Sequence, residues 1–306
     1  MVNYAVRCGW APVFVDLDPA DSLICMPCTI GAVIADRQIG VEEQFGEMAP
    51  LMYHFGHHSP TANSQLYNLL IANLAEAVNL RTEKTKTAAV SGVIVRSSNW
   101  VRQEGYQCII HAAQSFEADI VLVLDQEWLC SQLKQALPNA KVILLPKSGG
   151  VVSRSKEQRA SQRDMRIKHY FYGDRSKSTP TQISAYQLYP QVFDVKFTDV
   201  KIYRIGFEST VPESCLPIGL RVEDRNTSLV PVAPSASSLL HRLLSVSQAE
   251  SEDDEVVASP LLGFCVATAV DDQRKTMTVL APSGRPLPNH PGTILLLTEH
   301  AFIERV

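Results

Sequence analysis

Four short apolar runs in the first half of the chain predict strands that are buried on both faces. Each run is nearly continuous in aliphatic or aromatic residues and lacks the polar alternation of a strand with one face in water. Longer segments with helical spacing separate the runs, so their order predicts an α/β fold with a parallel sheet covered on both faces. The predicted strands are Val13–Asp18, Val90–Val95, Asp119–Leu124 and Lys141–Leu145.

The segments between these strands predict amphipathic helices. Leu66, Leu70, Leu74 and Val78 recur at every fourth position and therefore share one face of a helix. The predicted helices are Leu66–Leu80, Tyr106–Glu117, Glu127–Ala136 and a charged helix that starts at Arg154 and ends at Gly173.

The composition changes after the charged helix. Asp174–Pro190 is rich in Ser, Thr, Gln and Pro, which indicates a loop or insertion and a domain boundary. Beyond Phe193, short β-type runs are separated by Pro, Gly and Asn, which predicts a small β-rich domain. We therefore expect two domains, residues 1–192 and residues 193–306, with the insertion at 174–190.

The overall charge limits the kind of nucleic-acid site that the chain can carry. The sequence has 306 residues, 45% of them hydrophobic, a formal net charge of -4 and a pI near 6.1. Any RNA site must therefore be a local basic patch and not the whole surface. No apolar run reaches the roughly 18 residues that a spanning helix needs, and Met1–Trp10 lacks a signal-peptide pattern. We expect no membrane segment.

The seven cysteines are scattered and odd in number, which favours reduced thiols over a disulfide framework. Cys25 and Cys28 form the one C-x-x-C pair. A zinc site would require a second pair or histidines at ligand spacing, and the adjacent His57 and His58 seldom converge on one metal. We expect unligated thiols.

Asp16 and Asp18 lie two apart at the end of the first predicted strand, so both side chains point to the same side. Open α/β sheets bind ligands at this edge, and a strand ending in Asp can hold magnesium or orient an attacking hydroxyl. Many strands also end in Asp because a loop begins there, so the pattern alone leaves both readings open.

The charged helix carries a local excess of positive charge. Arg159, Arg163 and Arg166 fall at spacings of four and three and line one face. Between Arg154 and Lys177 there are eight Lys or Arg residues and three acidic residues. Arginine forks bind phosphate oxygens in pairs and stabilise a transferring phosphoryl group. The alternative is an ordinary solvated helix face.

Two loops after predicted strands carry further candidates. Trp100 and Arg102 follow Val90–Val95, where an aromatic ring could stack on an RNA base while the cation holds the backbone. A Trp is more often a packing residue. After the fourth strand, Pro146, Lys147, Ser148 and Gly149 form a loop whose glycines would let the backbone approach a nucleotide. A plain loop would use the same residues.

The printed sequence contains no G-x-x-x-x-G-K-[ST], and none of its 15 glycines is followed directly by Lys. That loop cradles the β- and γ-phosphates of a nucleotide in P-loop proteins. We therefore expect that this chain cannot transfer phosphate by itself.

Several segments together resemble the Clp-type polyribonucleotide 5'-hydroxyl kinases of the mRNA 3'-end cleavage and polyadenylation machinery. The resemblance spans nearly the whole chain. It is carried by Asn3–Arg7, Val15–Asp18, Ala49–Gly56, Val123–Glu127, Leu145–Val152, Tyr170–Gly173, Phe197–Tyr203 and Ser214–Pro217.

The resemblance implies a P-loop kinase-like parallel sheet, here without its first strand and phosphate loop, followed by a small β-rich domain. It implies that Asp18 positions magnesium and the RNA 5'-hydroxyl, that Trp100 stacks on a base, and that Arg159, Arg163 and Arg166 belong to an arginine lid at about 154–173. ATP and magnesium are the implied cofactors. The implied partners are RNA, the scaffold subunit of cleavage factor II and the tRNA-splicing endonuclease complex, in the nucleus.

Two departures from the family weigh against RNA capture. The family's active members carry Val-Gly-Gln-Gly where this chain has Pro19–Ser22, and a carboxylate at Asp21 would repel a phosphodiester backbone. The family's Cys-Gly-Trp is Ser98-Asn99-Trp100 here.

In addition, a missing central strand would leave neighbouring strands with unpaired edges and an exposed core face. We expect the isolated chain to be marginally stable, to aggregate or to be held by a partner.

Three functions stay open at this stage. The first is an RNA 5'-hydroxyl kinase whose sequence here is incomplete. The second is a non-catalytic scaffold of the cleavage and tRNA-splicing machinery, which the Pro19–Ser22 departure favours. The third is an unrelated ATPase-like adaptor.

Overall fold

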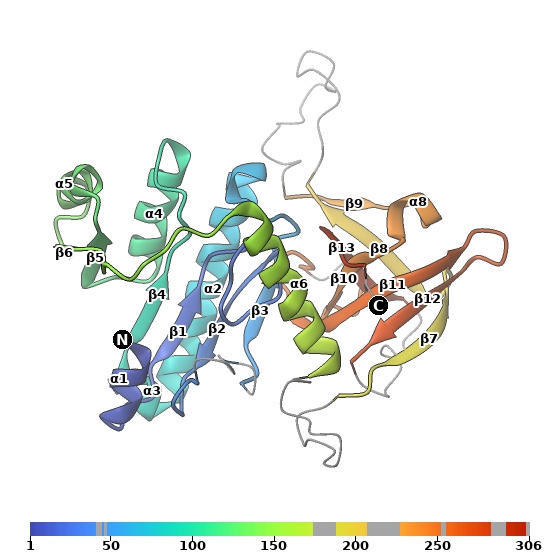
Figure 1. The fold of residues 1–306 in the computed structure, drawn as a ribbon, viewed down its shortest axis with the longest axis horizontal. Helices are drawn as coiled ribbons and strands as arrows, with labels where there is room; N and C mark the ends of the chain where they lie inside the picture. The colour runs from blue at the N-terminus through green and yellow to red at the C-terminus, as the bar shows by residue number, and fades with distance from the viewer. Residues whose placement is uncertain are drawn as a thin grey trace.

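The computed structural model describes residues 1–40, 45, 48–173, 188–206, 227–251, 255–282 and 292–303. The predicted insertion at 174–190 therefore falls largely outside the described residues, as does Ser214–Pro217. Along this part of the chain, α-helices and strands alternate first, and a β-rich region follows (Figure 1).

The first sheet has four strands in the order β3-β2-β1-β4. Strand β1 (Val13–Asp16) pairs in parallel with β4 (Val93–Arg96) and antiparallel with β2 (Thr29–Ile34). Strand β2 pairs antiparallel with β3 (Leu51–His54). The sheet is therefore mixed, because it contains two strands that the apolar runs did not indicate.

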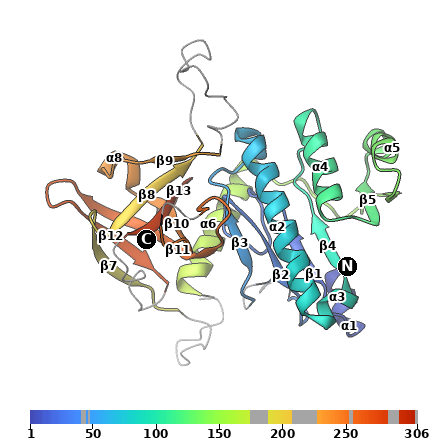
Figure 2. The same ribbon diagram turned by 180° about the vertical axis from the view of Figure 1, so that it is seen from behind.

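The remaining predicted strands form a separate parallel pair, β5 (Ile120–Leu124) and β6 (Lys141–Leu145). The prediction that the strands are buried on both faces is wrong for β4 and β5, because five of their apolar side chains are exposed: Val93, Val95, Ile120, Leu122 and Leu124. Strands β5 and β6 lie on the far side of β4 from the β-rich region in both views (Figures 1 and 2).

Helices fill the positions that the periodicity predicted, with small shifts at their ends. The predicted 66–80 helix is α2 (Ser64–Lys84), which starts early because the Asn63 side chain accepts a hydrogen bond from the Leu66 amide. A short helix, α3 (Lys86–Ser91), precedes β4, so β4 begins later than the predicted Val90. The other helices of this region are α1 (Val2–Arg7), α4 (Glu104–Ser115), α5 (Glu127–Ala136) and α6 (Lys156–Tyr172).

The β-rich region is one seven-stranded sheet in the order β7-β12-β11-β10-β13-β8-β9. All its pairs are antiparallel except β13 with β8. Its elements are β7 (Gln191–Lys196), β8 (Val200–Ile205), β9 (Leu229–Pro231), α8 (Ala236–Leu239), β10 (Arg242–Ser247), β11 (Leu261–Asp271), β12 (Thr276–Ala281) and β13 (Thr293–Ala301).

Helix α6 lies between the four-stranded sheet and the β-rich region (Figures 1 and 2). Its Ile167 and Phe171 are fully buried in a core cluster that contains residues of both regions. A buried hydrogen bond, 2.9 Å between His54 Nδ1 and Ser245 Oγ, also joins β3 to β10. The two sheets are thus fixed against each other as well as against α6. None of the described helices is long and apolar enough to cross a membrane.

Candidate functional site

Two carboxylates and one guanidinium form the base of the site at the end of β1. The Arg96 side chain donates to both Asp16 oxygens at 3.0 Å and to Asp18 Oδ2 at 3.1 Å. Asp16 and Arg96 lie side by side because β1 and β4 pair in parallel with these two residues in register. Asp16 and Asp18 therefore point to the same side, as their spacing predicted.

Asp16 is completely buried, and its oxygens are fully used. Besides Arg96, Oδ2 accepts from the Leu23 amide at 2.6 Å and Oδ1 from the Asp18 amide at 3.2 Å. Burial raises the pKa of Asp16, and the charge of Arg96 opposes that rise. Asp16 holds the loop after β1 in place.

Asp18 lies at the surface side of this pair. Its Oδ1 accepts from the amides of Ala20 and Asp21, at 3.1 and 3.3 Å, so it shapes the following turn. Its Oδ2 contacts only Arg96 among the hydrogen bonds described for this part of the chain. The predicted metal and catalytic role of Asp18 stays a prediction, and a cation there would have to share this oxygen with Arg96.

Arg154, which lies just before α6, and two arginines of α6 converge on Asp21. The closest atoms of Arg154, Arg159 and Arg163 lie 3.7, 3.9 and 3.8 Å from the Asp21 carboxylate. These separations are ion pairs and too long for hydrogen bonds. In agreement with this, Nε of Arg159 and Nε of Arg163 are buried without a hydrogen-bond partner. We call Arg154, Arg159, Arg163 and Arg166 the arginine face.

Arg166, the fourth member of the arginine face, reaches deeper. It donates to the Cys25 carbonyl at 3.4 Å, and burial lowers its pKa. The helix that carries these residues is fixed at its start by a capping box, in which the Ser155 and Gln158 side chains and amides bond each other. The spacing of four and three residues thus places Arg159, Arg163 and Arg166 toward the loop after β1.

The charges of this site do not balance. Arg154, Arg159 and Arg163 surround a single carboxylate, and the Nε donors of Arg159 and Arg163 have no hydrogen-bond partner. A phosphate group carries more charge and more acceptor oxygens than one carboxylate, so it is the kind of anion that such a cluster would bind.

The other predicted site residues lie apart from this cluster. Trp100 is half-buried against the central core, and its ring packs on Gly105, where a Cβ would come within 2.6 Å of the ring. Arg102 is exposed. Pro146, Lys147, Ser148 and Gly149 are exposed in the segment that leads from β6 to α6. Their proposed contacts with RNA and nucleotide stay predictions.

Sequence reasoning missed Arg96 and the role of Asp21. Arg96 directly follows the apolar residues of β4, and a cation at a strand end beside a strand ending in two carboxylates is a signal that could have found it. Asp21 was recognised as a departure, but its pairing with α6 required the fold.

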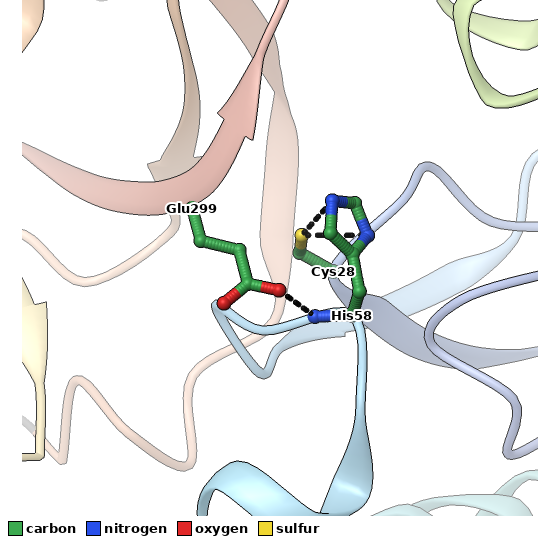
Figure 3. A group of neighbouring side chains, drawn as sticks. All are labelled: Cys28, His58 and Glu299. Atoms are coloured by element: carbon green, nitrogen blue, oxygen red, sulfur yellow. Dashed lines mark hydrogen bonds between the residues drawn. The ribbon is translucent and has the colours of Figure 1, made fainter. Parts of the chain in front are cut away.

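A second polar cluster contains Cys28, His58 and Glu299 (Figure 3). Among the described residues, Cys28, His58 and Glu299 offer ligand atoms that all lie within 4.8 Å of one another. Burial chiefly lowers the pKa of His58, to about 4, and raises the pKa of the Cys28 thiol. With His300, which contacts His58, we call these residues the thiol–imidazole cluster.

Two family descriptions match the chain. Residues 1–173 match the P-loop domain of the mRNA cleavage and polyadenylation factor CLP1, and residues 188–304 match the pre-mRNA cleavage complex II protein Clp1. Both regions of the structure are therefore accounted for by one family.

Curated relatives are similar over almost the whole chain. A polyribonucleotide 5'-hydroxyl-kinase Clp1 of Gallus gallus is 46% identical over 305 residues, which are 99% of this chain and 68% of that protein. The protein of the same name from Danio rerio is 45% identical, covering 99% and 67%. A CLP1 homologue of Culex quinquefasciatus is 46% identical, covering 99% and 68%.

Solved structures share the fold. A wild-type Clp1p–Pcf11p complex superposes with a TM-score of 0.82 at 22% identity, covering 99% of this chain and 70% of that chain. A second structure, of the interface between Pcf11p and Clp1p, gives a TM-score of 0.81 at 24% identity, covering 99% and 71%.

Proposed function

Because this chain belongs to the Clp1 family, we propose that it is an RNA-processing protein that binds RNA phosphate groups at the arginine face of α6. We also propose that it acts in mRNA 3'-end cleavage and polyadenylation, in tRNA splicing, and in the nucleus. The observation that carries the proposal is the convergence of Arg154, Arg159 and Arg163 on Asp21, beside the carboxylates of β1.

An RNA phosphate would enter where Asp21 now balances part of the charge. Guanidinium groups bind phosphate oxygens through parallel N–H donors, and Arg159 and Arg163 each have an Nε donor to offer. Asp21 is the intramolecular competitor, because its carboxylate occupies the centre of the same three side chains. RNA binding therefore has to displace the Asp21 carboxylate from its ion pairs with these arginines.

ATP and Mg²⁺ are the cofactors of the kinase reaction named for the relatives' family. Mg²⁺ is often held by one or two carboxylates together with substrate phosphates and water, and Asp18 fits such a role through Oδ2 if Arg96 yields part of that contact. Pro146–Gly149 would contact the nucleotide. When bound, ATP supplies the phosphoryl group, and Mg²⁺ neutralises charge on its oxygens. Arg159, Arg163 and Arg166 would steady that charge.

The second candidate function is a non-catalytic scaffold of the cleavage machinery. The position of Asp21 among the arginines favours the scaffold function, because its carboxylate would repel an RNA phosphate at the same place. The solved structures that share the fold contain Clp1p bound to Pcf11p, so the partner we propose is the scaffold subunit of cleavage factor II. The tRNA-splicing endonuclease complex is a further proposed partner.

A binding assay tests the phosphate-binding proposal. An RNA oligonucleotide with a 5'-hydroxyl and a 3' fluorophore is titrated with the 306-residue chain, and anisotropy gives the affinity. Arg159→Gln should weaken binding about tenfold, since one charge-assisted hydrogen bond is worth roughly 1.5 kcal/mol. Arg274→Gln is the matched control, because Arg274 is a well exposed arginine in the β-rich region. Equal affinities for the wild type and Arg159→Gln would contradict the proposal.

A kinase assay separates the two candidate functions. With ATP, Mg²⁺ and the same RNA, we expect this polypeptide to bind RNA without transferring phosphate, because its sequence lacks the phosphate-cradling loop. RNA phosphorylation by the chain would favour the kinase and exclude the pure scaffold.

A further inference from the structure

We propose that Cys28, His58 and Glu299 form a binding site for a zinc-type divalent cation that links the four-stranded sheet to the β-rich region. Cys28 directly precedes β2, His58 lies in the loop after β3, and Glu299 is on β13. A cation held by all three would tie the two regions together. Figure 3 shows the three side chains directed toward one another.

The separation of the two best ligand atoms fits zinc. Cys28 Sγ lies 3.6 Å from His58 Nδ1. With Zn–S bonds of about 2.3 Å and Zn–N bonds of about 2.0 Å, tetrahedral geometry puts sulfur and nitrogen roughly 3.5 Å apart. The Glu299 carboxylate lies within 4.8 Å of both atoms. Its side chain is 37% exposed, so it can move the remaining distance without disturbing the core.

The ligand set also fits in charge and chemical type. Thiolate, imidazole and carboxylate are the side chains that zinc prefers. Two negative ligands and one neutral imidazole cancel the charge of a divalent cation, which limits the cost of holding it in a half-buried place. A water molecule would complete the four ligands. The Cys28 thiol gives up its proton to solvent as the S–metal bond forms.

A second layer of side chains orients His58. If Nδ1 binds the metal, Nε2 carries a proton and donates to His300 Nδ1, 3.1 Å away. His300 is buried, and its own Nε2 has no hydrogen-bond partner, although Asp164 Oδ1 of α6 lies 3.4 Å away. Metal-bound histidines commonly donate their second N–H to such a partner. This chain of contacts connects the site to α6.

The backbone at Cys28 gives an independent reason to look for a role of its side chain. Cys28 has φ of 68°, a left-handed conformation that favours glycine. The conformation is held because the Cys28 amide donates to the Pro19 carbonyl and the Cys28 carbonyl accepts from the Phe55 and Gly56 amides. A residue other than glycine in this conformation lowers the stability of the fold, which indicates that the Cys28 thiol has a function.

The alternative is a hydrogen-bonded cluster that needs no metal. Glu299 already accepts from the His58 amide and lies 2.9 Å from His57 Nδ1. Such a network would also join the two regions. Cobalt separates the two cases, because a thiolate bound to Co²⁺ gives a strong near-ultraviolet band and a hydrogen-bonded thiol does not.

The test titrates Co²⁺ into the full 306-residue chain with a non-thiol reductant present, and measures zinc content by mass spectrometry after dialysis. Cys28→Gly is the main variant, because glycine suits the backbone conformation at this position. His58→Gln is the second variant. Cys25→Ala is the matched control, since Cys25 is the other buried thiol of the C-x-x-C pair.

We expect one tightly bound Co²⁺ or Zn²⁺ per wild-type chain, with a near-ultraviolet band that the Cys25→Ala control retains. Cys28→Gly should lose the band, and both variants should bind at least a hundredfold more weakly. Absence of stoichiometric metal in the wild type would overturn the proposal. Equal binding by the wild type and Cys28→Gly would also overturn it.

Discussion

Two polar clusters that neighbour each other beside α6 are of opposite kind. Arg163 contributes to the arginine face, which holds an excess of guanidinium groups around Asp21. The next residue, Asp164, faces His300 of the thiol–imidazole cluster, whose ligand set is charge-balanced for a divalent cation. One helix thus presents an anion-binding surface and a cation-binding surface through neighbouring residues. Charge along a helix has to be assigned face by face, because a net count over the segment hides both sites.

The largest expected effect comes from removing Arg96, the guanidinium that pairs with the two carboxylates at the end of β1. Arg96→Met leaves the buried Asp16 carboxylate without its cation, and the unfolding free energy should fall by about 3 kcal/mol. Urea unfolding followed by circular dichroism measures it. Arg274→Met, a control at an exposed position, should stay within about 0.5 kcal/mol of the wild type. A small loss for Arg96→Met would mean that Asp16 is satisfied by its amides alone.

Acid should weaken the contact between the two regions through His54. Burial lowers the pKa of folded His54 to about 3, whereas the unfolded value is near 6.5. Between these values the unfolded chain binds more protons, so stability falls as pH decreases below about 6.5, by at most about 1.4 kcal/mol per pH unit. His54→Gln should make the unfolding free energy depend less steeply on pH, as measured by urea unfolding at several pH values between about 7 and about 5. An unchanged slope would assign the acid sensitivity to other groups.

A smaller effect should come from Asp21. Asp21→Asn removes the carboxylate that competes with RNA for the arginine face, and RNA affinity should rise a few-fold. Fluorescence anisotropy with the 5'-hydroxyl oligonucleotide measures it. Asp36→Asn, which alters an exposed aspartate outside the cluster, is the control. Weaker RNA binding by Asp21→Asn would mean that Asp21 positions the arginines and does not compete with RNA.

Local patterns predicted most helices and the strands with long apolar runs. They missed β3 and its neighbour β2, which contains Gly31, whose Cβ would come within 2.3 Å of the Leu51 carbonyl oxygen. The close approach of these two strands explains the glycine. A glycine required by the close packing of two strands interrupts the apolar pattern from which a strand is predicted.

Local spacing likewise predicted some of the site residues and missed those that depend on the fold. The period of two in a strand predicted that Asp16 and Asp18 share one side, and helix spacing predicted the shared face of Arg159, Arg163 and Arg166. The partner of the carboxylates, Arg96, depends on which strand lies beside β1. The thiol–imidazole cluster was not predictable, because Glu299 is far from Cys28 and His58 in sequence and reaches them only through the packing of the two regions.

The salt dependence of RNA binding tests most directly whether the arginine face binds phosphates. Anisotropy titrations at several salt concentrations compare the wild type with the double variant Arg154→Gln/Arg159→Gln, which spares Arg163 and its neighbours in the thiol–imidazole cluster. Each phosphate contact on single-stranded RNA contributes a slope of about -0.7 in log affinity against log salt. We expect the slope to become shallower by about 1.4 in the double variant. Equal slopes would place the RNA phosphates elsewhere and contradict the proposed function of the arginine face.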